Sequence, residues 1–85
     1  MQPKGVFEMK QLNTRLELRN IQTRLREAIQ KSHFKQKEIG YAVGVSEKTI
    51  SAYMNKDVFP ALDTLAKLCI FLDVSADVIL GITKN

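Results

Sequence analysis

Residues 36–55 read QKEIGYAVGVSEKTISAYMN, and the fold depends on this stretch. Ile39 and Val43 are four residues apart, as on the buried face of a helix. Gly44 follows them, and a glycine favours a helix end because it readily takes a positive φ. Ser46 is then a typical N-cap for a second helix. The stretch therefore predicts two short helices joined by a tight turn, over residues 36–43 and 47–55.

Two short helices joined by a glycine-containing turn form a helix-turn-helix. Where the two helices approach each other the sequence has Gly40, which carries no side chain to keep them apart. The inside of the corner needs apolar side chains, and four positions supply them: Ile39, Val43, Val45 and Ile50. The second helix leaves short or polar residues for its outer face: Glu47, Lys48, Thr49, Ser51 and Ala52. Such a face fits the major groove of DNA.

Three further helices are predicted around this motif. The spacing of apolar residues predicts a first helix near residues 20–31, with Asn20 as its N-cap. A helix over residues 62–72 has one apolar face: Leu62, Leu65, Leu68, Cys69 and Leu72. A last short helix is capped by Ser75 and ended by Gly81. No run alternates apolar and polar residues long enough for a strand, so the expected fold class is all-α with five short helices.

The first residues differ from the rest of the chain. Met9, Leu12 and Leu16 keep a helical spacing, but this spacing is out of phase with the apolar positions that follow. Residues 1–19 are therefore either an N-terminal arm or an extra helix, and the sequence leaves both open. Residues 20–85 are expected to form the helix-turn-helix domain.

Composition limits the function classes that are open to the chain. The chain has 85 residues, one cysteine and one histidine, which exclude a disulfide framework and a cysteine-based zinc site within one chain. We expect no metal and no cofactor. Neither a membrane-spanning stretch nor a signal peptide is found, so a cytoplasmic protein with no membrane partner is expected. Paired carboxylates, a nucleophile–base set and a phosphate loop are also missing, which argues against an enzyme.

The charges of the chain are unevenly distributed. Residues 1–56 carry eleven Lys and Arg against five Glu, whereas residues 57–85 carry two Lys against four Asp. The net charge is +4. A basic part of this size favours a polyanion, with nucleic acid ahead of a membrane surface.

The chain resembles a known family over about residues 21–82. The segment RLREAIQKSHFKQKEIGYAVGVSEKTISAYMNKDVFPALDTLAKLCIFLDVSADVILGI is similar to the lambda-repressor-like domains of the Cro-type (xenobiotic response element) helix-turn-helix family. The ending VSADVILG extends the similarity well beyond the twenty-residue motif. The resemblance implies a five-helix fold, binding to double-stranded DNA, and a dimer on a two-fold operator.

The resemblance also implies DNA-binding roles for eight residues: Gln36, Ser46, Glu47, Lys48, Thr49, Ser51, Asn55 and Lys56. Gln36 matches a glutamine that contacts phosphate and braces the recognition helix. Glu47 and Lys48 match positions that read bases, with Ser46 and Ser51 on either side of them. Thr49 and Asn55 match positions that hold the DNA backbone, and Lys56 follows at the helix end. In chemical terms, Lys48 can donate to guanine O6 or N7, and Glu47 can accept from cytosine N4.

Two departures from the family pattern affect the ends of the helices. Lys35 stands where the family has a Ser or Thr cap before the glutamine. The segment Met54-Asn55-Lys56 replaces a frequent ending of the recognition helix that includes glycine.

Four residues near the motif have simpler interpretations. Arg24 and Arg26 are expected on solvated helix faces, and Cys69 is expected in the core. Tyr53 fits either core packing or a hydroxyl contact to phosphate, and the sequence leaves both open.

The sequence predicts a sequence-specific transcriptional regulator, namely a repressor that binds an inverted-repeat operator as a homodimer. The C-terminal helix is expected to form the dimer contact through Val78, Ile79 and Ile82. An aspartate at Ile79 or Ile82 is then expected to weaken dimerisation and operator binding together while leaving the fold intact. The alternative is a protein-interaction module, antitoxin-like or anti-repressor-like, in which the N-terminal residues suit a protein partner.

Overall fold

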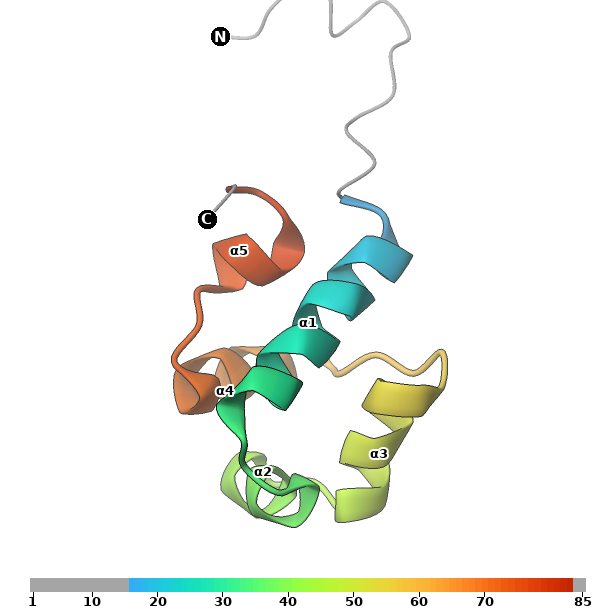
Figure 1. Ribbon diagram of the computed structural model, residues 1–85, viewed down its shortest axis with the longest axis vertical. Helices are drawn as coiled ribbons and strands as arrows, with labels where there is room; N and C mark the ends of the chain where they lie inside the picture. Colours follow the sequence, from blue (N-terminus) through green and yellow to red (C-terminus); the bar gives the residue numbers. More distant parts are fainter. Residues whose placement is uncertain (1–15, 84–85) are drawn as a thin grey trace, which may run out of the picture.

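A computed structural model describes residues 16–83, which form five α-helices and no strand. The helices are α1 (Leu18–Ser32), α2 (Gln36–Val43), α3 (Glu47–Asn55), α4 (Leu62–Leu72) and α5 (Ala76–Leu80) (Figure 1). The predicted all-α class with five short helices is confirmed. Met9 and Leu12, which suggested an extra helix, lie outside the described residues.

The first helix begins earlier than the sequence suggested. It starts at Leu18, and Glu17 rather than Asn20 is its N-cap, with no hydrogen bond from the Glu17 side chain. The prediction of Asn20 as the cap is therefore wrong. The backbone N–H groups of Asn20 and Ile21 both donate to the Glu17 carbonyl at 3.0 Å, so the first turn closes without a side-chain cap.

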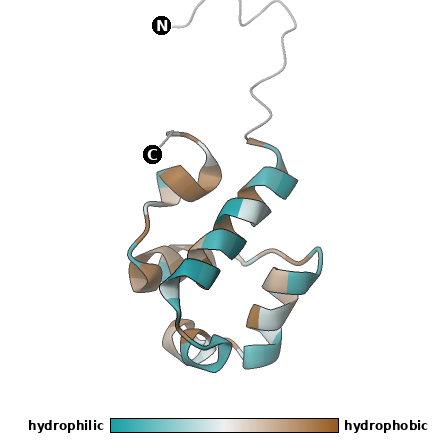
Figure 2. Cartoon of the chain, in the orientation of Figure 1, coloured by the Kyte–Doolittle hydropathy of each residue, from teal (hydrophilic) through white to brown (hydrophobic). Residues whose placement is uncertain are grey.

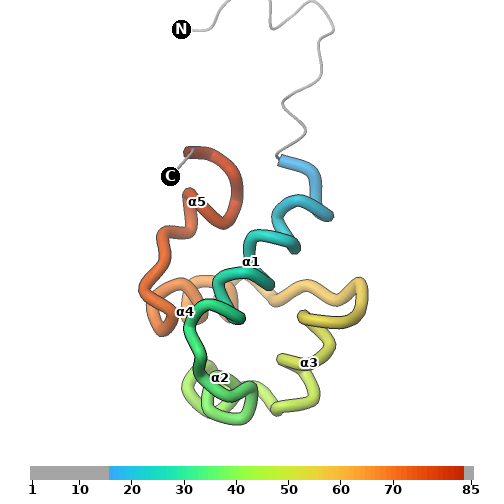
Figure 3. The backbone as a smooth tube through the Cα atoms, in the orientation of Figure 1, coloured from blue at the N-terminus to red at the C-terminus, as the bar shows by residue number. Residues whose placement is uncertain are grey.

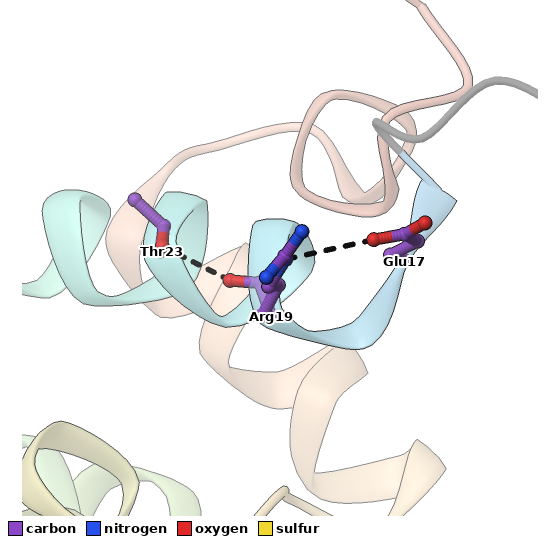
Figure 4. A network of polar contacts seen from close by, with 3 residues as sticks. All are labelled: Glu17, Arg19 and Thr23. Atoms are coloured by element: carbon purple, nitrogen blue, oxygen red, sulfur yellow. Dashed lines mark hydrogen bonds and ion pairs between the residues drawn. The ribbon is translucent and has the colours of Figure 1, made fainter.

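Exposed polar contacts accompany this first turn of α1. The Thr23 hydroxyl donates to the Arg19 carbonyl at 3.0 Å, and Arg19 Nε lies 3.5 Å from Glu17 Oε1 (Figure 4). Because the Arg19–Glu17 pair is exposed, it adds little to stability.

A short corner joins α2 to α3 (Figure 3), and it has the glycine geometry that the sequence predicts. Gly44 takes φ +84°, and its N–H donates to the Gly40 carbonyl at 2.8 Å. The Val45 N–H donates to the same carbonyl at 2.9 Å. A Cβ atom on Gly40 would lie only 2.7 Å from the Val45 carbonyl oxygen. The backbones therefore meet at Gly40 so closely that no side chain fits between them.

The core lies between the helices and is formed by ten buried residues: Leu25, Ile29, Ile39, Val43, Ile50, Tyr53, Leu68, Cys69, Leu72 and Ile79. Cys69 is in the core as predicted, and burial raises the pKa of its thiol. Leu62, which was expected on the same buried face, is 85% exposed instead. Leu62 is the first residue of α4, so its side chain extends past the end of the packed part of the helix.

Ile79 is also part of the core, because its side chain is only 2% exposed. The predictions that Ile79 contributes to a dimer contact, and that Ile79→Asp leaves the fold intact, are therefore wrong. In a helix of five residues, Ile79 is the position that packs against α1, whereas Ile82 lies beyond the helix and is exposed.

An aromatic pair joins the connection between α1 and α2 to α4. The rings of Phe34 and Phe71 have centroids 4.7 Å apart and are tilted by 37°. This contact lies in the range that favours offset aromatic pairs. It adds a contact between the α1–α2 connection and α4, and α2 and α4 also pack against each other. α2 and α3 lie together at the end of the molecule away from α5 (Figure 1).

Replacement of Gly40 by alanine tests the close approach of the two helices. In a free helix, Gly→Ala stabilises by about 1 kcal/mol. Here we expect Gly40→Ala to lower the free energy of unfolding by about 2 kcal/mol, because the new methyl group meets backbone atoms that cannot move aside. Urea unfolding followed by circular dichroism measures the change. An increase in stability would contradict the packing at this corner.

Candidate nucleic-acid interface

The N-terminus of α3 is capped by a side chain that was predicted to lie beside the DNA. Ser46 Oγ accepts the N–H of Thr49 at 3.0 Å and lies 3.0 Å from Thr49 Oγ1. The Ser46 hydroxyl therefore satisfies one of the free N–H groups of the helix, as its role as N-cap requires. Ser46 remains exposed and Thr49 is half-buried, so both lie at the surface at the start of α3.

The two faces of α3 differ in chemistry. Ile50 and Tyr53 face the core, and Glu47 and Lys48 are exposed. Tyr53 is only 3% exposed, which decides between its two interpretations in favour of core packing. Burial also raises the pKa of the Tyr53 hydroxyl, because the core disfavours the charged phenolate. The polar face of α3 is thus free to meet a ligand while the other face anchors the helix.

The last turn of α3 has a second pair of predicted site residues. Asn55 Nδ2 donates to the Ser51 carbonyl at 3.0 Å and to Ser51 Oγ at 3.2 Å. Lys56 follows as the C-cap with an extended backbone, φ −133° and ψ 171°, and its side chain is exposed. The helix therefore ends without the left-handed glycine that the family often has.

Two residues of α1 hold this end of α3, and the sequence analysis did not identify either. Gln22 Nε2 donates to the Lys56 carbonyl at 3.0 Å, and Arg26 Nη2 donates to the same oxygen at 3.0 Å. Arg26 Nε also donates to the Tyr53 carbonyl at 2.8 Å. The last carbonyl groups of a helix have no partner within it, and the side chains of α1 satisfy two of them here.

Arg24 and Arg26 were expected on solvated faces. This expectation is wrong, because guanidinium nitrogens of both side chains donate to backbone carbonyl groups of other helices. Arg24 Nε donates to the Ile79 carbonyl at 2.8 Å, near the end of α5, as Arg26 does at the end of α3. Both side chains are half-buried. The periodicity of α1 did not show this, because the crossing of α1 over the two other helices decides which residues meet. The one signal in the sequence was Gln22 itself, a polar residue on the face of α1 that Leu25 makes apolar.

At the start of α2, the first side chain is half-buried and its neighbours are exposed. Gln36 is the first residue of the helix, and Lys35 and Lys37 on either side of it are exposed. Lys35 has no acceptor to offer as a cap; instead, Glu38 Oε1 accepts the Lys35 N–H at 2.8 Å. The first turns of α2 and α3 thus carry lysines together with one glutamate each, Glu38 and Glu47. The helix dipole favours an anion at both ends, and these glutamates oppose it.

The structure brings the predicted site residues into three groups. Gln36 begins α2, whereas Ser46, Glu47, Lys48 and Thr49 lie at the start of α3, and Ser51, Asn55 and Lys56 follow along that helix.

Residues 16–83 contain no cluster of three or more His, Cys, Asp or Glu side chains that would hold a metal ion. In the same residues, no helix has the length and apolar character needed to cross a membrane.

Comparison with known proteins agrees with this geometry. A family model described as helix-turn-helix matches residues 25–79, which is more than half of the chain. The match begins at Leu25 in α1 and ends at Ile79 in α5, so it includes the two helices of the motif and most of the bundle around them. No curated protein and no solved structure matches the chain.

The contact between α1 and the end of α3 is tested by replacing Arg26. We expect Arg26→Met to lower the free energy of unfolding by about 2 kcal/mol, because two hydrogen bonds from a charged donor are lost while the apolar stem is kept. Hydrogen exchange should also become faster at the amides of the last turn of α3. Arg19→Met is the matched control in the same helix, since Arg19 makes only an exposed ion pair. Unchanged exchange in Arg26→Met would show that α1 does not hold α3.

Proposed function

The chain belongs to the Cro-type helix-turn-helix family of DNA-binding regulators, and from this premise we propose that it is a repressor that binds an inverted-repeat operator as a homodimer. The proposal rests on one observation: α3 has an apolar buried face and a polar exposed face. Its apolar face is fixed in the core by Ile50 and Tyr53, and its polar face is exposed. A helix that reads bases needs both features, because its side chains must reach the groove in a fixed orientation.

Base recognition is assigned to the two exposed residues at the start of α3. Lys48 donates to guanine, and Glu47 accepts from the amino group of cytosine. The other six predicted residues contact the sugar-phosphate backbone or lie beside the bases: Gln36, Ser46, Thr49, Ser51, Asn55 and Lys56. Because Ser46 and Asn55 make hydrogen bonds within the protein, their role includes holding α3 in shape. Phosphate contacts then fix the position of the protein, and base contacts choose the sequence.

The dimer contact is assigned to the end of the chain around Ile82. Ile82 is 64% exposed and follows α5, and Val78 in α5 is half-buried. Ile82 and Val78 together leave apolar surface at this end of the chain, which a second copy would cover. A two-fold contact there would place two copies of α3 on one face of the DNA, about 34 Å apart.

Selection from a random pool of duplex DNA tests base recognition. We expect the protein to enrich an inverted repeat. Lys48→Ala should reduce the preference for one base, at one position of each half-site, by about 1–3 kcal/mol. Lys67→Ala is the matched control, because Lys67 is an exposed lysine on α4, outside the motif. Retention of DNA without enrichment, or no retention, would reject the proposal and favour the protein-interaction module.

Replacement of Ile82 tests the dimer. We expect Ile82→Asp to sediment as a monomer, to bind the operator more weakly and to keep its helical circular dichroism, because the side chain is outside the core. Ile70→Asp is the control, since Ile70 is similarly exposed but lies on α4. If Ile82→Asp remains dimeric, the contact lies elsewhere.

A further inference from the structure

An apolar groove lies on a side of the molecule that the helix-turn-helix does not use. Its volume is about 140 Å³, and it lies between the start of α1, the loop before α4, the start of α4 and α5. No residue of α2 or α3 contributes to it. Large apolar side chains line the groove, among them Leu18, Ile21, Phe59, Leu62, Leu65 and Leu80.

Large apolar side chains at the edge of this groove are exposed to solvent. Leu18 is 63% exposed, Leu62 is 85% exposed, and Phe59 is also exposed. Single exposed apolar side chains are ordinary at a protein surface. Three of them around one apolar groove indicate instead a surface that is covered by another segment.

The residues that precede the groove in the sequence are the nearest candidate for that segment. Residues 1–15 lie outside the described residues, and the described chain begins at Leu16, two residues before Leu18 on the edge of the groove. Fifteen residues reach up to about 50 Å when extended, which is more than enough to fold back. A tether this short also keeps a segment at an effective concentration on the order of millimolar.

The composition of the N-terminal residues fits an apolar groove. Val6, Phe7, Met9 and Leu12 are apolar, and they occur within seven positions. Phe7 and Met9 are side chains of the kind that fill apolar pockets, because one is large and the other is flexible.

Charge favours these residues over a second copy of the C-terminal part. Residues 1–15 carry Lys4, Lys10 and Arg15 against one glutamate. At the edge of the groove, Asp57 lines a neighbouring hollow together with Leu18, Arg19 and Phe59, and Asp63 follows Leu62 in the chain. Arg19 is paired with Glu17 at 3.5 Å, so carboxylates remain in excess at this edge. The C-terminal part of a second copy would bring further aspartates against these carboxylates, which is unfavourable.

We propose that residues 6–12 bind in the apolar groove formed by α1, α4, α5 and the loop before α4 of the same molecule. The N-terminal residues then cover Leu18 and Leu62, and the helix-turn-helix stays free. No residue of α2 or α3 lines this groove, so the inference holds or fails independently of base recognition by α3.

A spin label on the N-terminal residues tests the proposal in the full chain. Gln11→Cys introduces one reactive thiol, and the native Cys69 is protected because it is buried and burial raises its pKa. We expect the label to broaden the amide NMR signals of Leu62 and Leu80 more strongly than those of Glu47 and Lys48, at the end of α3 away from the groove. A mixture of spin-labelled unenriched chains with unlabelled, nitrogen-15-enriched chains should show no such broadening, because the contact is within one molecule.

Two substitutions on α4 provide the matched comparison. Leu62→Asp should abolish the broadening at Leu80, because it puts a carboxylate on the edge of the groove; it keeps the fold, since Leu62 is exposed and an acidic residue suits the first turn of a helix. Ile70→Asp changes a side chain of similar exposure that does not line the groove, and should leave the broadening unchanged.

Each other outcome overturns the proposal. No broadening at the groove in the labelled chain means that residues 6–12 do not bind there. Broadening of equal strength in the mixed sample means that the segment comes from a second copy. Loss of broadening in Ile70→Asp but not in Leu62→Asp means that the contact lies on another face of α4.

Discussion

The close approach of the backbone at Gly40 is the constraint on which the rest of the structure depends. A Cβ atom at this position would lie 2.7 Å from the Val45 carbonyl oxygen, so α2 and α3 meet at this corner only because the side chain is missing. The Gly40 carbonyl also accepts the N–H groups of Gly44 and Val45, which ends α2 and shapes the turn. The same corner buries Ile39 and Ile50 completely, so α3 is fixed along one face.

The other end of α3 is fixed by a different helix. The chain has no glycine to end α3, and Lys56 leaves the helix in an extended conformation. The carbonyl groups of Tyr53 and Lys56 are satisfied instead by Gln22 and Arg26 of α1. Polar groups from a neighbouring helix thus replace a local cap, and this connects the orientation of α3 to the packing of the bundle.

Polar and apolar surfaces occupy different parts of the molecule. Most of α1 is hydrophilic, whereas α5 and the turn after it are mostly hydrophobic (Figure 2). The exposed polar side chains of Glu47 and Lys48 belong to α3, whereas the exposed apolar side chains of Leu18, Leu62 and Ile82 belong to α1, α4 and the turn after α5. This arrangement allows contacts with other segments or chains to form without covering the surface proposed to bind DNA.

The sequence by itself determined the helices, the turn and the polar face of α3, because these depend on local interactions. Gly44 after an apolar pair and the hydroxyl of Ser46 act within a few residues, so their effects can be predicted without knowledge of the fold. The assignment of DNA-contacting residues rests on a family resemblance and stays a prediction.

Only the tertiary structure decided which side chains meet across helices. Helical periodicity predicts that Ile79 and Ile82 point in similar directions, and likewise Leu62 and Leu65. It does not predict which member of each pair a neighbouring helix covers. The crossing of α1 over α3 likewise brings Arg26 to a carbonyl group that is 27 residues away in sequence. Such contacts depend on the angles and positions of whole helices, and these result from the packing of all five.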